Sequence, residues 1–339
     1  AGLAATQLNG LVSSRLSALT DTQLNGLRSD VLLSLAGTQM DALTSGTLMG
    51  LSATQLDGFY SSALFSLADT QLDGLSSGLL VGLSVTQLDG LVSTRISGLS
   101  GTQLDGLLSA ALALLANTQL DGLLSASILT LSGTQLDGLG SLQLAGLADT
   151  QLDGLRANDL SSMAGTQLDG LVSSSLTALS NTQLDGLHSS VLSSLAGTQL
   201  DALQSDRLTA LAMTQLDGLQ SGALLGLAAT QLDGMTSAQI GSLSATQMDG
   251  LHSSGLISLS GTQWDGMTSQ QLLTMTDIVL DGLASVGLST LAATQLNSLG
   301  SALLATLADT QLNGLTSNGL SSMANTQMDG MSSMQLLAL

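Results

Sequence analysis

The dipeptide Thr-Gln recurs every sixteen residues, from Thr6-Gln7 to Thr326-Gln327, and no insertion or deletion breaks the register. This recurrence defines 21 slots, of which only the slot at Ile278-Val279 lacks the dipeptide. A fixed short period is the signature of a repeat architecture in which each unit packs on its neighbours. We therefore predict that residues 1–339 form a single solenoid of 21 tandem repeats. Because the chain starts and ends part-way through a repeat, we expect it to be a section of a longer protein.

Leucine and small residues occupy fixed places within each repeat. If Thr is place 1, leucine or a close substitute fills places 3, 6, 11 and 14, as in Leu88, Leu91, Ile96 and Leu99. A small residue follows two places after each of them, so the repeat consists of two similar octads. Hydrophobic residues make up 44% of the chain at this strict spacing, which indicates a packed core rather than disorder. Places 7, 9, 10 and 12 vary freely, and we expect them to face solvent.

Two architectures are compatible with this pattern. In the first, the fold class is all-β and each sixteen-residue repeat forms one coil of a β-solenoid, with coils stacked about 4.8 Å apart. In the second, the fold is a solenoid in which each octad is a short helical segment, capped by the serine at place 15 or by the residue at place 16.

Three observations favour the β-solenoid. Sixteen residues is about half the length of known helix-pair repeats. Glycine at place 5, in 18 of 21 copies, falls inside the first expected helix, where it costs about 1 kcal/mol. The chain also has no Glu and no Lys, which helix surfaces normally use. We therefore predict the β-solenoid and keep the short-helix solenoid as the alternative.

Two short stretches resemble known repeat families. Residues 51–56, Leu-Ser-Ala-Thr-Gln-Leu, resemble the Leu-Thr-x-x-Gln octads of very long bacterial secreted and surface proteins. Residues 165–168, Gly-Thr-Gln-Leu, resemble part of the sixteen-residue repeats of bacterial ice-nucleation proteins, which contain Ser-Thr-Gln-Thr. Leu168 replaces the second threonine of that family's Thr-x-Thr pair, and its recurrent tyrosine is missing. The first resemblance implies a location outside the cell or at its surface. The second implies a face that organises water or ice.

The charge of the chain restricts its partners. All 25 acidic residues are aspartate, all five basic residues are arginine, and the net charge is −20. This charge repels nucleic acid and anionic membranes, and it favours cations and basic surfaces. No apolar run is long enough to predict a transmembrane segment. The absence of cysteine leaves the redox compartment open.

Aspartate fills place 4 in 17 of 21 copies. In a β-solenoid these carboxylates would lie about 5 Å apart and repel by about 3 kcal/mol per neighbouring pair at an effective dielectric of 20. Bound calcium, raised pKa values or Asp-Gly turns whose carboxylates cap their own backbone would offset this repulsion. We expect the Asp-Gly turn and keep calcium as the only candidate cofactor. The candidate calcium row comprises Asp57, Asp73, Asp89, Asp105, Asp121, Asp137, Asp153, Asp169 and Asp185.

The remaining candidate residues indicate structure rather than catalysis. Stacked Thr-Gln rows are expected to form amide ladders from coil to coil. Trp264 replaces leucine at place 3, so we expect it in the core, with a role in assembly as the alternative. Ile278 and Val279 replace the polar dipeptide and are candidates for an assembly contact. The only histidines, His188 and His252, have no distinctive serine partner, so we predict no enzyme activity.

These expectations together predict a structural repeat module of an extracellular filament, sheath or adhesin stalk. It would self-associate end to end or laterally, through regular ladders and uncapped ends. The alternative is a ligand-binding array, either a calcium-loaded adhesive surface or a face that organises ice or water.

Overall fold

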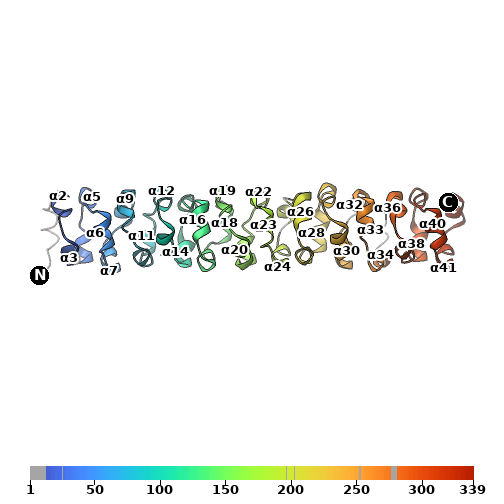
Figure 1. Cartoon of the computed structure of the whole chain (residues 1–339), viewed down its shortest axis with the longest axis horizontal. Coiled ribbons are helices and arrows are strands. Elements are labelled where there is room, and N and C mark those ends of the chain that lie inside the picture. The colour runs from blue at the N-terminus through green and yellow to red at the C-terminus, as the bar shows by residue number, and fades with distance from the viewer. Residues whose placement is uncertain (1–12, 25, 196, 202, 252, 276–280) are drawn as a thin grey trace. The chain divides into compact units, whose positions relative to one another are not determined.

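The computed structural model describes residues 13–24, 26–195, 197–201, 203–251, 253–275 and 281–339. In these ranges every regular element is a short α-helix and no β-strand occurs (Figure 1). The all-β solenoid with one coil per repeat is therefore wrong. The alternative, a solenoid of short helical octads, describes the fold. No helix in the described ranges has the length and apolar character needed to cross a membrane.

The chain divides into two compact units, Ala1–Leu171 and Val172–Leu339, and each is a solenoid of short helices. The helices of the first unit are α2 (Ser13–Leu16), α3 (Asp21–Leu24), α4 (Ser29–Leu32), α5 (Gly37–Met40), α6 (Ser45–Met49), α7 (Ala53–Leu56), α8 (Ser61–Ser66), α9 (Asp69–Leu72), α10 (Ser77–Leu80), α11 (Val85–Leu88), α12 (Ser93–Ile96), α13 (Gly101–Leu104), α14 (Ser109–Leu114), α15 (Asn117–Leu120), α16 (Ser125–Thr130), α17 (Gly133–Leu136), α18 (Ser141–Gly146), α19 (Asp149–Leu152), α20 (Ala157–Ser162) and α21 (Gly165–Leu168).

The second unit repeats the same scheme. Its helices are α22 (Ser173–Ala178), α23 (Asn181–Leu184), α24 (Ser189–Leu192), α25 (Gly197–Leu200), α26 (Ser205–Ala210), α27 (Met213–Leu216), α28 (Ser221–Gly226), α29 (Ala229–Leu232), α30 (Ser237–Ser242), α31 (Ala245–Met248), α32 (Ser253–Ser258), α33 (Gly261–Asp265), α34 (Ser269–Thr274), α36 (Ser285–Thr290), α37 (Ala293–Leu296), α38 (Ser301–Thr306), α39 (Asp309–Leu312), α40 (Ser317–Ser322), α41 (Asn325–Met328) and α42 (Ser333–Ala338).

Within the described ranges, an octad contributes one helix of four to six residues followed by a short extended link. The helix α13 shows how the sequence begins and ends such a segment. Ser100 is the N-cap, in an extended conformation with φ −70° and ψ 159°, and Asp105 at the other end still has helical dihedral angles. The backbone N–H of Leu104 donates to the carbonyl of Ser100 at 2.9 Å, which closes the single helical turn. The serine at place 15 is thus the cap that the helical alternative expected.

The four leucine places form the core, as the sequence predicted. In the copy with Leu88, Leu91, Ile96 and Leu99, all four side chains are buried. Each buried leucine stabilises the fold by roughly 1.5–3 kcal/mol relative to an exposed one. Of the variable places, place 10 is an exception to the expected solvent exposure. It is buried in several copies, because it is the third residue of the second helix of the repeat and its side chain faces the preceding turn, as at Gln143.

Successive turns of the solenoid contain between three and four octads. Helices pack on the helix three positions further along, as α10 does on α13 and α26 does on α29. Side-chain hydrogen bonds between turns join residues that lie 28 and 31 positions apart. A sixteen-residue repeat therefore covers only part of a turn, and the octad is the structural unit. In Figure 1 the colour advances steadily along each unit as turn follows turn.

Glycine at place 5 is explained by the close approach of neighbouring turns. A Cβ atom on Gly138 would overlap with the backbone of Ser109, in the preceding turn, and the same overlap recurs at place 5 along both units. None of the described glycines has positive φ, so left-handed backbone is not the reason. The helix ends at place 3, before the glycine. Glycine at place 5 therefore does not weaken a helix, contrary to the expectation from the sequence.

We expect Gly218→Ala to destabilise the second unit by about 1–3 kcal/mol, because its Cβ would overlap with the backbone of Ser189. The matched control is Gly222→Ala, four residues away, whose Cβ would meet nothing within 4 Å. This control should be neutral or slightly stabilising, because alanine favours the helix. Thermal unfolding followed by circular dichroism at 222 nm compares the two variants. Equal losses of stability in the two variants would contradict the explanation that neighbouring turns approach too closely for a Cβ atom at place 5.

Candidate functional site

The recurrent polar site of this fold is the glutamine at the third position of a helix, called N3. In α13 the Oε1 atom of Gln103 accepts a hydrogen bond from the backbone N–H of Ser100 at 2.9 Å. Its Nε2 atom donates to the carbonyls of Leu72 and Leu75 at 2.7 Å each. These carbonyls belong to the end of α9 and the link after it, one turn earlier. We call this set of three bonds the glutamine clamp.

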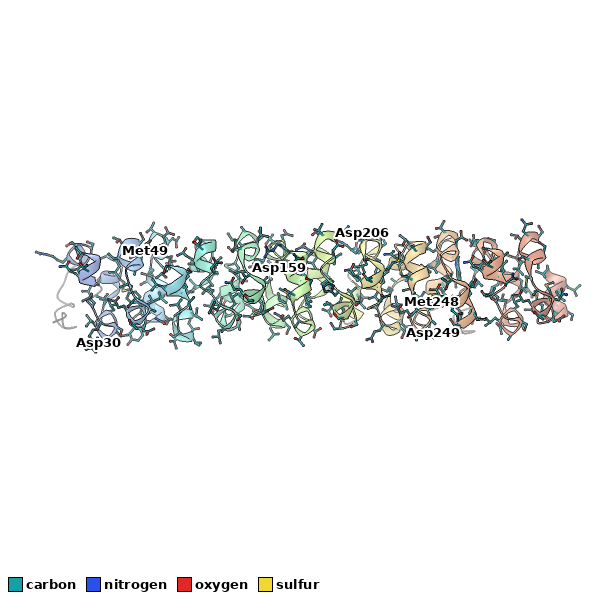
Figure 2. All side chains as sticks on the ribbon, turned by 60° about the horizontal axis from the view of Figure 1, so that its bottom comes forward. Asp30, Met49, Asp159, Asp206, Met248 and Asp249 are labelled. Carbon is teal, nitrogen blue, oxygen red and sulfur yellow. The ribbon has the colours of Figure 1, made fainter. Side chains whose placement is uncertain are left out.

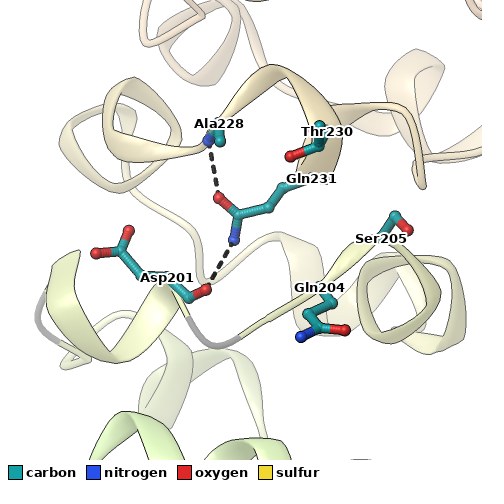
Figure 3. Close-up of a pocket in the computed structure, with 6 residues that line it drawn as sticks. All are labelled: Asp201, Gln204, Ser205, Ala228, Thr230 and Gln231. Carbon is teal, nitrogen blue, oxygen red and sulfur yellow. Dashed lines mark hydrogen bonds between the residues drawn. The ribbon is translucent and has the colours of Figure 1, made fainter.

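The clamp recurs through both units. Figure 3 shows Gln231, whose Oε1 accepts from the N–H of Ala228 at 2.8 Å. Its Nε2 donates to the carbonyls of Leu200 and Leu203 at 3.0 and 2.8 Å, and more weakly to that of Asp201 at 3.5 Å. The other glutamines that donate to two carbonyls 28 and 31 residues earlier are Gln71, Gln87, Gln119, Gln135, Gln143, Gln151, Gln167, Gln215, Gln239, Gln247, Gln263, Gln271, Gln295, Gln327 and Gln335.

The clamp replaces the expected amide ladder. We predicted that the glutamine side chains would bond to one another from coil to coil. They bond instead to backbone groups that short helices leave without a helical partner. Four of the clamps, at Gln143, Gln239, Gln271 and Gln335, fall at place 10, which we had assigned to the variable surface. The signal that finds them is glutamine eight residues after the glutamine of a Thr-Gln pair.

Arginine takes the N3 position in some octads and contacts the same part of the preceding turn. Arg207 of α26 donates to the carbonyls of Leu179 and Thr177, the latter at 3.1 Å, and to Oδ1 of Asn181 at 3.0 Å. Arg95 of α12 donates to the carbonyl of Phe65 at 3.3 and 3.4 Å and to Asp69 at 2.5 Å. A guanidinium supplies several donors in a fixed geometry, so it can satisfy several acceptors of the neighbouring turn at once.

In α20 the two side chains of an ion pair together form the kinds of hydrogen bond that one glutamine forms in a clamp. Asp159 occupies N3, with only 5% of its side chain exposed, and accepts from the backbone N–H of Arg156 at 2.8 Å. The guanidinium of Arg156 donates to Asp159 at 3.0 Å and to the carbonyl of Leu131, 25 residues earlier, at 3.3 Å. The hydrogen bond and the charge of Asp159 raise the pKa of Arg156. The pair therefore keeps a buried carboxylate compensated and still reaches the preceding turn.

Shallow hollows lie beside the clamps where the N-cap is alanine. The hollow in Figure 3 has a volume of about 470 Å³ and is lined by Asp201, Gln204, Ser205, Ala228, Thr230 and Gln231. Equivalent hollows lie at Ala68 and Ala148, with Asp41 and Asp121 in their walls. Where the N-cap is serine, as at Ser132, its Oγ contacts the neighbouring threonine and glutamine at 3.0 Å each. Hydroxyls, one or two amides and one carboxylate line each of the three hollows. These groups can form hydrogen bonds or attract a cation, but they do not include a paired acid and base.

All nine side chains of the predicted aspartate row are exposed. Each follows a four-residue helix directly, as Asp105 follows α13. The backbone N–H of Asp105 donates to Gly101, and that of Gly106 donates to Gln103, so the Asp-Gly segment forms the helix end. The expected spacing of about 5 Å required one coil per repeat. That arrangement is wrong, so the expected spacing and the repulsion calculated from it do not apply.

Nothing in the described ranges assembles three or more metal-binding side chains in one place. Asp30 and Asp206, which are outside the row, are also exposed, and Figure 2 shows them at the edge of the ribbon. Calcium binding by the row that runs from Asp57 to Asp185 stays a prediction.

The other candidate residues from the sequence analysis do not share one site in the described ranges. Trp264 is 1% exposed, in the core of α33, and a Cβ on Gly287 of α36 would overlap with its indole ring. Its ring is therefore not on the surface that an assembly contact would use. Ile278, Val279 and His252 lie outside the described residues. His188 is exposed at the N-cap of α24.

No known protein-family model matches the chain, and no curated protein matches it.

Adding a clamp should stabilise the fold. Ala111 occupies N3 of α14, and a glutamine there would reach the carbonyls of Leu80 and Leu83, at the same separations as Gln103. We expect Ala111→Gln to stabilise the first unit by about 1 kcal/mol, the net value of a typical hydrogen bond. Ala111→Glu is the control, because its carboxylate has no N–H to donate. Urea unfolding measures both. A gain for the glutamate as large as that for the glutamine would contradict the clamp.

Removing the arginine from the ion pair should lower the stability of the first unit, and a second substitution should restore it. Arg156→Ala leaves the buried carboxylate of Asp159 without its partner, and we expect a loss of about 2 kcal/mol, because half of the arginine is exposed to water. Adding Asp159→Gln to that variant should restore most of the lost stability, because one glutamine makes all the bonds of a clamp. Thermal unfolding of the wild type, the single variant and the double variant checks this. A double variant no more stable than the single one would refute it.

Proposed function

We propose that this chain is a structural repeat module, a spacer of an extracellular filament, sheath or adhesin stalk, whose length is set by its number of octads. The single observation that carries the proposal is the repetition of one backbone-to-side-chain clamp through both units. Each clamp joins a turn only to the turn before it. Such nearest-neighbour contacts allow a solenoid to grow without a change of fold.

Two further features support a spacer. The lined hollows repeat with the sequence and hold no paired acid and base. The resemblance of Leu51–Leu56 to the octads of secreted and surface proteins supports a location outside the cell. Self-association, end to end or lateral, remains part of this proposal, although it cannot use side-chain ladders.

Adding whole repeats should lengthen the module by a constant amount. We expect one, two or four extra copies of residues 133–148 to increase the maximum dimension from small-angle X-ray scattering in proportion to the number of copies. The mean residue ellipticity at 222 nm should not change, because every new turn makes the same clamps. An insertion of residues 133–144 is the control, because twelve residues displace the octad register by half. A stable protein with that insertion, or an increase that is not proportional to the number of whole repeats, would argue against the spacer.

A further inference from the structure

One side of the first unit carries a line of exposed apolar side chains, one from each successive turn. Its members are Leu33, Tyr60, Val85, Leu114 and Leu142, which are 39%, 58%, 53%, 51% and 81% exposed. Consecutive members are 25 to 29 residues apart in the sequence. We call these five residues the apolar stripe.

Contacts between turns place the members of the stripe next to one another. Leu33 and Tyr60 line the same hollow of about 190 Å³, together with Met40 and Ala63. Tyr60 is the N-cap of α8, and Val85 begins α11, which packs on α8.

Leu114 and Leu142 are placed in the stripe by similar contacts. Gly82 and Gly146 approach the side chains of residues 29 positions earlier. Leu114 has the same place in its octad as these glycines, so it lies over Val85. Asn117 donates to the carbonyl of Leu142 at 3.2 Å, which places Leu142 beside the end of α14, where Leu114 lies. The five side chains thus follow one another along the unit.

The charges beside the stripe decide which partner it fits. Asp89 ends the same helical turn that Val85 begins, so the two lie on one face of α11. Asp57 directly precedes Gly58, which lines the hollow of Leu33 and Tyr60. Arg28, at the N-cap of α4, is paired with Asp30 at 3.4 Å. A second copy of this chain would bring carboxylates against carboxylates, whereas a basic surface would complement them.

The spacing of the stripe indicates the shape of that partner. Helices that pack on one another lie about 8–10 Å apart, so the stripe presents one apolar side chain at about that interval. An α-helix presents the same face again after seven residues, about 10.5 Å. We propose that the apolar stripe docks a basic amphipathic helix of another protein, with its apolar face on the stripe and its lysine or arginine side chains towards Asp57 and Asp89. This proposal does not depend on the spacer function.

A synthetic peptide tests the proposal on the full chain. The probe is four copies of Leu-Lys-Lys-Leu-Lys-Lys-Lys with a fluorescent label, and its scrambled sequence is the control peptide. Fluorescence anisotropy at about 150 mM salt measures binding to the wild type, to Val85→Ser/Leu114→Ser and to Leu124→Ser/Leu129→Ser. The second double variant is matched, because Leu124 and Leu129 are 54% and 49% exposed and lie outside the stripe. Circular dichroism at 222 nm verifies the fold of each variant.

We expect the stripe variant to weaken binding of the ordered peptide by about tenfold, as for the loss of central apolar anchors. The matched variant should bind like the wild type, and the scrambled peptide should bind about tenfold more weakly. Equal weakening by both variants, or equal affinity for both peptides, would mean that charge alone attracts the probe and would overturn the proposal. Dimerisation of the wild type that Val85→Ser/Leu114→Ser abolishes, with no peptide binding, would assign the stripe to a second copy instead. If Val85→Ser/Leu114→Ser unfolds, Tyr60→Ser takes its place with the same expected loss.

Discussion

The fold depends on how a chain of four- to six-residue helices satisfies its backbone polar groups. So short a helix leaves most of its N–H and C=O groups without a helical partner, and unpaired buried groups are costly. The glutamine clamp meets this requirement at the start of one helix and at the end of another. The side chain of Gln103 caps the start of its own helix and pairs carbonyls at the end of a helix one turn earlier. One amide thus joins local structure to tertiary structure.

The other invariant places serve the same geometry. The amide reaches the preceding turn only if the two backbones come close, and Gly138 permits this because it has no Cβ to meet the backbone of Ser109. Leucines such as Leu104 and Leu107 fill the interior that this approach encloses. Packing and hydrogen bonding therefore restrict different places of the same sixteen-residue repeat.

The surface is free to vary because neither requirement applies to it. Where the sequence departs from glutamine at N3, side chains with other donors take over, as Arg207 and the Arg156–Asp159 pair do. Exposed places tolerate apolar residues as well, including Met49, at the edge of the ribbon in Figure 2, and the members of the apolar stripe. A regular scaffold with a variable exterior supports both the spacer and a docking surface, because changes at the surface leave the clamps intact.

The sequence by itself determined the register and the leucine core and indicated a structural role for glutamine, because these follow from strict spacing and residue type. It did not determine whether the segments were strands or helices. Leucine with a small residue two places later fits an inward-facing strand, and it equally fits a four-residue helix that ends before Gly106. Nor did it reveal the role of place 10, because Gln143 is one residue among many types there. Only the tertiary structure decided these points, because the decisive partners lie 28 and 31 residues apart and no multiple of sixteen predicts that separation.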